Sequence, residues 1–197
     1  MTSDTTKTAR VEILYFSGFG HTQKQAEALH EGAAATTGAG LWAVDDTGTL
    51  GDDGWAALDA AGAIVFGSPT YMGGPAWQLK KVIDESSKRW MERAWVDKLA
   101  GGFTNSAGLV GDKGETLGAF QILAAQHGML WVPLNQTPAN VMASTADDVN
   151  WAGANVGAMA ISPADAGPDQ APRRGDLESA RLYGQRIATL VRDGISR

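Results

Sequence analysis

The stretch VEILYFSGFGHT, which runs from Val11 to Thr22, decides the fold of this chain. Its first half, Val11 to Phe16, is an almost unbroken apolar run, which is typical of a strand buried on both faces of a parallel sheet. Its second half is a loop of small and hydroxyl residues that leads into a helical pattern from Thr22 to about Thr36. A buried strand followed at once by a helix predicts the first unit of an α/β fold.

The rest of the chain repeats this alternation. Further candidate strands share the short apolar run, and they are Leu41–Val44 (the weakest), Ala63–Gly67, Leu99–Phe103 and Met129–Pro133. Further helical patterns are Gly54–Ala61, Pro75 to about Arg93, Glu115–His127, and Asp176 to about Arg192. Pro75 suits a first helical position, and Asp176 suits a helix cap. Alternating strands and helices predict a doubly wound α/β fold, with a five-stranded parallel sheet in the order 2-1-3-4-5.

Length and composition limit the classes of protein that remain. The 197 residues predict a disordered N-terminal tail over 1–10 and a single domain over 11–197, in which 134–175 is an irregular excursion. Sixteen basic and 22 acidic residues give a net charge of −6, so we expect no nucleic-acid partner. The chain has no Cys and three scattered His, so we expect no metal site. The apolar run at Val11–Phe16 is too short for a signal peptide or a membrane span, and we expect a cytoplasmic protein.

The loop Ser17–Thr22 has the composition of a phosphate site. In a doubly wound sheet a ligand lies beyond the carboxyl ends of the strands, where the strand order reverses. Small residues that end at a helix start gather backbone N–H groups, hydroxyls and the positive end of the helix dipole, so a phosphate fits there without Lys or Arg. A dinucleotide fingerprint would need Gly at Gln23, and the chain has no GxxxxGK[ST] run. A glycine-containing turn without a ligand fits the same residues.

Two further loops are expected at the same edge. Gly67–Pro75 is stiffened by prolines and carries Tyr71 and Met72, which suits a flat aromatic ligand. Thr104–Asp112 again consists mostly of small, hydrogen-bonding residues. Because the carboxyl ends of parallel strands share one edge, the three loops predict one pocket.

Four segments of the chain together resemble a known family. They are Leu14–His21, Val65–Gly73, Lys98–Ser106 and Gln126–Met129. The chain resembles the flavodoxin-like FMN oxidoreductases from Val11 to about Leu190, in the branch typified by the tryptophan-repressor-binding-protein quinone reductases. It departs from that branch at Tyr71-Met72, where the family usually has a basic residue and Phe, and in a third loop less rich in glycine.

The resemblance implies a set of FMN-binding residues. The phosphate would be held by Ser17, Gly18, Phe19, Gly20, His21 and Thr22. The isoalloxazine ring would be bordered by Pro69, Thr70, Tyr71, Met72 and Gly73, and its pyrimidine side would be covered by Asn105, Ser106, Ala107, Gly108 and Gly111. Trp90 would lie near the flavin face. His127 would reach the flavin and the substrate space, often from the environment of a neighbouring subunit, and would position the substrate. His127 also ends a helix, where it can simply complement the helix dipole.

The resemblance also implies a function. It is an FMN-dependent NAD(P)H oxidoreductase that transfers a hydride through flavin N5 to quinones or similar flat acceptors, as a homodimer or homotetramer. A flavodoxin-type one-electron carrier would bind the same FMN, and an FMN or azo reductase is a further alternative. A receiver-like domain without enzymatic activity would need acidic residues at the strand ends, where this chain has Ser17 and Ser68.

Overall fold

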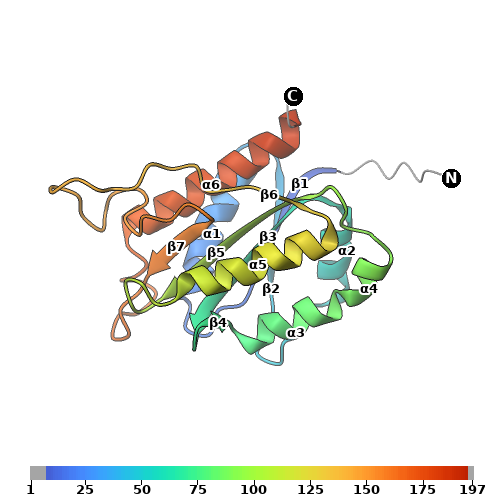
Figure 1. The fold of residues 1–197 in the computed structure, drawn as a ribbon, viewed down its shortest axis with the longest axis horizontal. Coiled ribbons are helices and arrows are strands. Elements are labelled where there is room, and N and C mark those ends of the chain that lie inside the picture. Colours follow the sequence, from blue (N-terminus) through green and yellow to red (C-terminus); the bar gives the residue numbers. More distant parts are fainter. Residues whose placement is uncertain (1–7, 195–197) are drawn as a thin grey trace.

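The computed structural model describes residues 8–194 of the chain (Figure 1). Its strands are β1 (Thr8–Tyr15), β2 (Gly38–Ala43), β3 (Ala61–Tyr71), β4 (Gly74–Pro75), β5 (Leu99–Ser106), β6 (Leu130–Trp131) and β7 (Ala158–Ile161). Its helices are α1 (His21–Ala34), α2 (Asp52–Ala60), α3 (Trp77–Glu85), α4 (Ser87–Met91), α5 (Lys113–His127) and α6 (Arg174–Asp193).

The main sheet has the predicted topology. Its strands lie in the order β2-β1-β3-β5-β6, and each of these pairs is parallel. The five predicted strands therefore take the order 2-1-3-4-5, which confirms the doubly wound, flavodoxin-like fold. The chain leaves β1 on one side to form β2 and crosses to the other side to form β3, so the strand order reverses beside β1.

The fifth position of the sheet is filled by two short strands. β6 pairs with the start of β5 at Leu99 and Ala100, and β7 pairs with its end, from Phe103 to Ser106. Residues 132–157 leave the sheet between them and pass outside it (Figure 1). The predicted irregular excursion over 134–175 is therefore wrong in one part, because β7 inside it completes the sheet next to β5.

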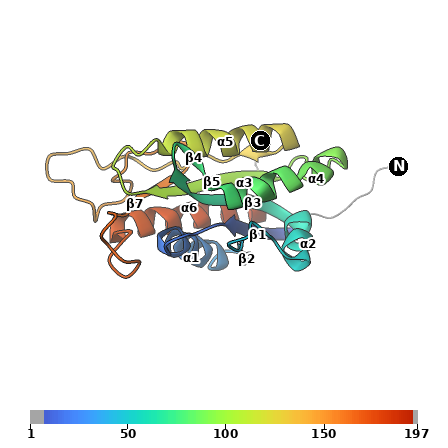
Figure 2. The same ribbon diagram turned by 90° about the horizontal axis from the view of Figure 1, so that it is seen from below.

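Two helical layers cover the sheet. Figure 2 shows α5 on one side and α1 and α6 on the other. Apolar side chains of α1 and α6 pack on one face, and those of α2, α3 and α5 pack on the other. A Cβ atom at Gly32 would clash with the backbone of α6, and one at Gly184 would clash with the backbone of α1. Glycine at both positions lets these two helices touch backbone to backbone, and this contact holds the second half of α1 against α6.

Three predicted boundaries differ from the structure. Thr8 to Arg10 belong to β1, so the predicted tail over 1–10 is too long, and residues 1–7 lie outside the described residues. The single helix predicted from Pro75 to Arg93 is wrong, because Pro75 pairs in β4 and the helical segment is divided into α3 and α4 at Ser86. The N–H of Ala76 donates to the buried Ser68 hydroxyl at 2.9 Å, and α3 begins after it at Trp77, two residues later than predicted.

The start of α6 also differs. Arg173 is its N-cap, and Asp176 lies inside the first turn, where its carboxylate accepts the N–H of Ile161 at 2.9 Å. The carboxylate therefore joins the helix to β7 rather than capping its own helix. Among residues 8–194, no helix has both the length and the apolar character needed to cross a membrane. Over the same residues, no three His, Asp or Glu side chains gather closely enough to hold a metal ion.

Candidate functional site

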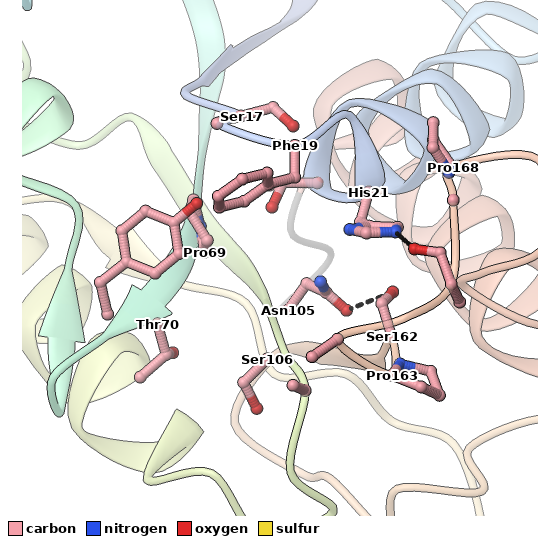
Figure 3. Close-up of a pocket in the computed structure, with 17 residues that line it drawn as sticks. Ser17, Phe19, His21, Pro69, Thr70, Asn105, Ser106, Ser162, Pro163 and Pro168 are labelled. Atoms are coloured by element: carbon pink, nitrogen blue, oxygen red, sulfur yellow. Dashed lines mark hydrogen bonds between the residues drawn. The ribbon is translucent and has the colours of Figure 1, made fainter.

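A cavity of about 500 Å³ lies beyond the carboxyl ends of β1, β3 and β5, beside the reversal of strand order (Figure 3). All three predicted loops contribute to it. The predicted residues that line it are Ser17, Gly18, Phe19, His21, Thr22, Pro69, Thr70, Tyr71, Asn105, Ser106 and Ala107. The structure therefore brings the three loops together into one pocket at the predicted edge of the sheet.

The first loop forms a cradle of hydrogen-bond donors. The backbone N–H groups from Gly18 to Thr22 donate to no other residue among those described. Thr22 is a buried residue that lines the cavity, and its hydroxyl has no protein partner within residues 8–194. Helix α1 begins at His21 without a side-chain cap. Gly20 is left-handed, with φ of 86°, which turns the chain into the helix. Such a set of free donors at a helix N-terminus fits a phosphate dianion.

The backbone N–H of Gln23, in the first turn of α1, is not free for a ligand, because it helps to shape the first loop. The Ser17 hydroxyl accepts the N–H of Gln23 at 3.1 Å, which draws the loop back onto the first turn of α1. A Cβ atom on Gly18 would lie only 2.6 Å from the Tyr71 hydroxyl oxygen. Glycine at this position therefore lets the second loop close against the first.

An aromatic pair forms the side wall of the cavity. The rings of Phe19 and Tyr71 meet edge to face, with centroids 6.4 Å apart. Phe19 is 75% exposed and Tyr71 is 39% exposed, so the pair lies at the mouth rather than in the core. Burial raises the pKa of the Tyr71 hydroxyl, which keeps it protonated at neutral pH. The wall therefore offers flat apolar surface with a neutral donor.

The remaining predicted glycines and Met72 shape the loops rather than line the cavity. Met72 and Gly73 have φ of 47° and 81° and form the turn between β3 and β4, where the Met72 side chain is fully exposed. Gly111 is left-handed and packs on Ser106, and Gly108 offers its carbonyl to the Ser106 hydroxyl at 3.1 Å.

Buried side chains that line the cavity form hydrogen bonds with one another or with side chains behind it. The Thr70 hydroxyl lies 2.8 Å from the Thr104 hydroxyl and 2.8 Å from that of Thr116. The Ser162 hydroxyl donates to the side-chain oxygen Oδ1 of Asn105 at 3.0 Å, and the side-chain amide nitrogen of Asn105 has no partner among the described residues. That amide nitrogen is a free donor on a side chain that lines the cavity.

The fourth wall was missed in the sequence. Residues of the segment 162–168, which follows β7, line the cavity on the side away from Thr70 (Figure 3). A hydrogen bond of 2.9 Å joins the ring Nε2 of His21 to the carbonyl oxygen of Ala166, and so ties this wall to the start of α1. One signal was present, because Ser162-Pro163 directly follows β7, and a Ser-Pro pair, Ser68-Pro69, also stands near the cavity end of β3. The run Ala158–Ile161 is only four residues long and was not identified as a strand.

His127 does not reach this cavity. It is the last residue of α5, and a helix of 15 residues is about 20 Å long, so His127 lies at the opposite edge of the sheet. Its Nε2 lies 2.9 Å from the Ser86 hydroxyl oxygen, and that hydroxyl donates to the Ile83 carbonyl at 2.7 Å, so the imidazole donates. Its ring packs against Trp95, with centroids 4.5 Å apart. Burial lowers the pKa of His127.

Trp90 is also separated from the cavity. It lies in α4 with 53% of its surface exposed, and with His127 it borders a second groove of about 650 Å³ between α3, α4 and α5. Within one chain, neither His127 nor Trp90 lies with the three loops of the cavity. Their predicted roles toward the flavin therefore stay predictions that would need a neighbouring subunit.

The cavity lies at the carboxyl ends of a parallel sheet, with hydrogen-bond donors after β1 and an aromatic wall after β3. This arrangement is typical of the ligand site of a flavodoxin-like protein. Comparison with known proteins supports this class. A family model described as NADPH-dependent FMN reductase matches residues 54–141. The flavodoxin FldP of Pseudomonas aeruginosa is 46% identical, over 92% of this chain and 96% of its own length. An NAD(P)H dehydrogenase (quinone) of Geotalea uraniireducens is 29% identical over 92% of this chain and 97% of its own length.

The solved structures agree with the sequence comparisons. A crystal structure titled "flavodoxin, WrbA-like protein" from Agrobacterium tumefaciens has 47% identity and a TM-score of 0.76, covering 94% of this chain and 99% of the other. The chain belongs to the flavodoxin-like FMN oxidoreductases, in their WrbA-like branch. The donor set fits FMN, because the unpaired N–H groups and the Thr22 hydroxyl suit its phosphate and the flat aromatic wall suits its ring.

Proposed function

We propose that this protein is an FMN-dependent oxidoreductase that takes a hydride from NAD(P)H and passes it to quinones or similar flat acceptors. The observation that carries the proposal is the cavity itself, in which free donors for a dianion lie beside an exposed aromatic wall. The relatives named NAD(P)H dehydrogenase (quinone) and the matching FMN reductase model support the choice of reductant and acceptor.

The proposed roles of the residues follow from their places in the cavity. The N–H groups of Gly18 to Thr22 and the Thr22 hydroxyl would bind the phosphate, and Phe19 and Tyr71 would flank the ring. Asn105 would donate from its free amide nitrogen to the polar edge of the ring. When bound, FMN supplies the hydride chemistry, so the protein needs to place and tune it rather than to provide an acid–base pair.

We also propose that the chain acts as a homodimer or homotetramer in the cytoplasm. Trp77, Trp90 and Ile122 are 60%, 53% and 64% exposed, on α3, α4 and α5. These helices cover the same side of the sheet, and large exposed apolar side chains favour burial between subunits. Light scattering on the FMN-loaded protein tests this part, and a monomer at micromolar concentration would contradict it.

Anaerobic absorbance spectroscopy tests the proposed activity. NADH or NADPH is added to the FMN-loaded protein, and the visible flavin band should bleach within seconds and return when a benzoquinone is added. Dithionite serves as the control, because it reduces the flavin whatever the natural donor is. Bleaching by dithionite but not by either nicotinamide would exclude the proposed donor.

A flavodoxin-type electron carrier is the second candidate. The 46% identity to a protein named flavodoxin favours it. Stepwise reduction distinguishes the two functions, because a carrier accumulates a one-electron-reduced form and turns over NAD(P)H negligibly. The enzyme should pass to the two-electron-reduced form with little of that intermediate.

A further inference from the structure

Lys113 is a buried cation directly behind the third loop of the cavity. It is the first residue of α5, and only 1% of its surface is exposed. Its ammonium group donates to the Ser106 hydroxyl at 2.8 Å, to the Gly108 carbonyl at 2.8 Å and to the Leu109 carbonyl at 3.0 Å. An ammonium group has three donors and no acceptor, so its full hydrogen-bonding capacity is used.

These three contacts determine the shape of the loop. The side chains of Leu109 and Val110 are 61% and 77% exposed, so apolar packing does not hold this segment in place. Lys113 instead collects oxygen atoms of the loop around one charge. The N–H groups from Ala107 to Asp112 donate to no residue in the described part of the chain. Oxygen atoms of the loop therefore accept hydrogen bonds from Lys113, whereas its backbone N–H groups remain free to bind a ligand.

The charge lies close to the cavity. Ser106 lines the cavity and also receives a hydrogen bond from the ammonium group, so one hydroxyl separates the cation from the ligand space. Burial lowers the pKa of Lys113, whereas Asp176 raises it. No ion pair within 4 Å involves Lys113 among residues 8–194. A cation without a contacting carboxylate creates a positive potential that water screens only weakly.

The one acid that acts on this charge is itself buried. Asp176 is 2% exposed, and one of its oxygens accepts the Ile161 N–H while the other has no partner. Burial raises the pKa of Asp176 to about 6, although the Ile161 N–H and Lys113 lower it. Lys113 and Asp176 are thus opposite charges behind β5 and β7, and they do not form a contact pair.

We propose that Lys113 is a positioning residue that shapes the 105–111 loop and biases the cavity toward the form of FMN with one more negative charge. This inference rests on FMN occupying the cavity. A hydride from NAD(P)H brings two electrons and one proton, so oxidised FMN gains one negative charge while NAD(P)⁺ leaves. A fixed cation beside the cavity stabilises that added charge, and the reduced cofactor binds more tightly than the oxidised one.

The midpoint potential of bound FMN tests this inference. In Lys113→Met the affinity for reduced FMN should fall about tenfold more than the affinity for oxidised FMN, which lowers the two-electron potential by about 30 mV. Lys113→Arg should keep most of the wild-type potential, because it keeps the charge. Lys80→Met is the matched control, since Lys80 is exposed on α3 and pairs with Asp84, and its potential should match that of the wild type.

Two further measurements separate charge from structure. In the apoprotein of Lys113→Met, limited proteolysis should cut within residues 107–112 faster than in the wild type, and Lys113→Arg should restore part of the resistance. Asp176→Asn removes the opposing charge, so at pH 8 it should raise the potential, and this test holds even where Lys113→Met folds poorly. An equal loss of affinity for both redox forms, or no shift in Asp176→Asn, would overturn the inference. A wild-type protein that binds no FMN would instead overturn the proposed function.

Discussion

The substitution Thr22→Val isolates the phosphate cradle from the stability of the fold. Thr22 is 2% exposed in the first turn of α1, and its hydroxyl has no partner within the described residues. Valine has nearly the same shape, so the change removes the hydroxyl without leaving a void. We therefore expect the free energy of unfolding of the apoprotein to change by less than about 1 kcal/mol.

The effect on FMN binding should be much larger. A hydrogen bond to a charged group contributes about 1.5–3 kcal/mol, which corresponds to roughly 10- to 100-fold in the dissociation constant. Titration of the apoprotein with FMN, followed by quenching of flavin fluorescence, measures this change. Thr36→Val, which lies just beyond the other end of α1, is the control and should bind FMN like the wild type. Wild-type affinity in Thr22→Val would refute the assignment of this hydroxyl to the phosphate.

Three further predictions concern the structure around the site. His127→Ala should lower the free energy of unfolding by about 2 kcal/mol, because it removes the partner of Ser86 and the contact with Trp95; an FMN dissociation constant more than threefold above wild type would contradict its purely structural role within one chain. Asp176→Asn should alter the pH dependence of urea unfolding. The pKa of Asp176 in the folded state is raised from 3.8 to about 6. The free energy of unfolding of the wild type is therefore highest, relative to the variant, below about pH 4, and it falls by roughly 3 kcal/mol as the pH rises through 6. Parallel pH profiles would contradict that assignment. Gly184→Val should destabilise the fold by at least about 3 kcal/mol in thermal unfolding, since its side chain would enter the backbone of α1; a smaller loss would show that the two helices separate easily.

Most of the fold and three walls of the cavity were predictable from the sequence. Val11–Phe16 and Ala63–Gly67 are apolar on both faces, which only buried parallel strands require. Once the strands are parallel, the loops that follow them must share one edge of the sheet. The proximity of Ser17–Thr22 to the two later loops could therefore be predicted without knowing any contact between distant residues.

The remaining features depend on distances and packing that a local pattern does not contain. The wall at 162–168 was missed because β7 has only four residues, two of them alanines. Its strand conformation depends on hydrogen bonding to β5, which the local sequence does not reveal. The likeness at Gln126–Met129 gave His127 a role toward the flavin but no position in the fold. The length of α5 carries its last residue about 20 Å from the cavity.

Binding of FMN and of riboflavin to the apoprotein, compared by isothermal titration calorimetry, tests the central claim most directly. The two compounds share the ring and differ in the phosphate, for which the cradle after β1 offers the Thr22 hydroxyl and a row of unpaired N–H groups. Several hydrogen bonds to a dianion predict that FMN binds at least about 100-fold more tightly than riboflavin. Equal affinities would show that this loop holds no phosphate, and the account of the site would then be wrong.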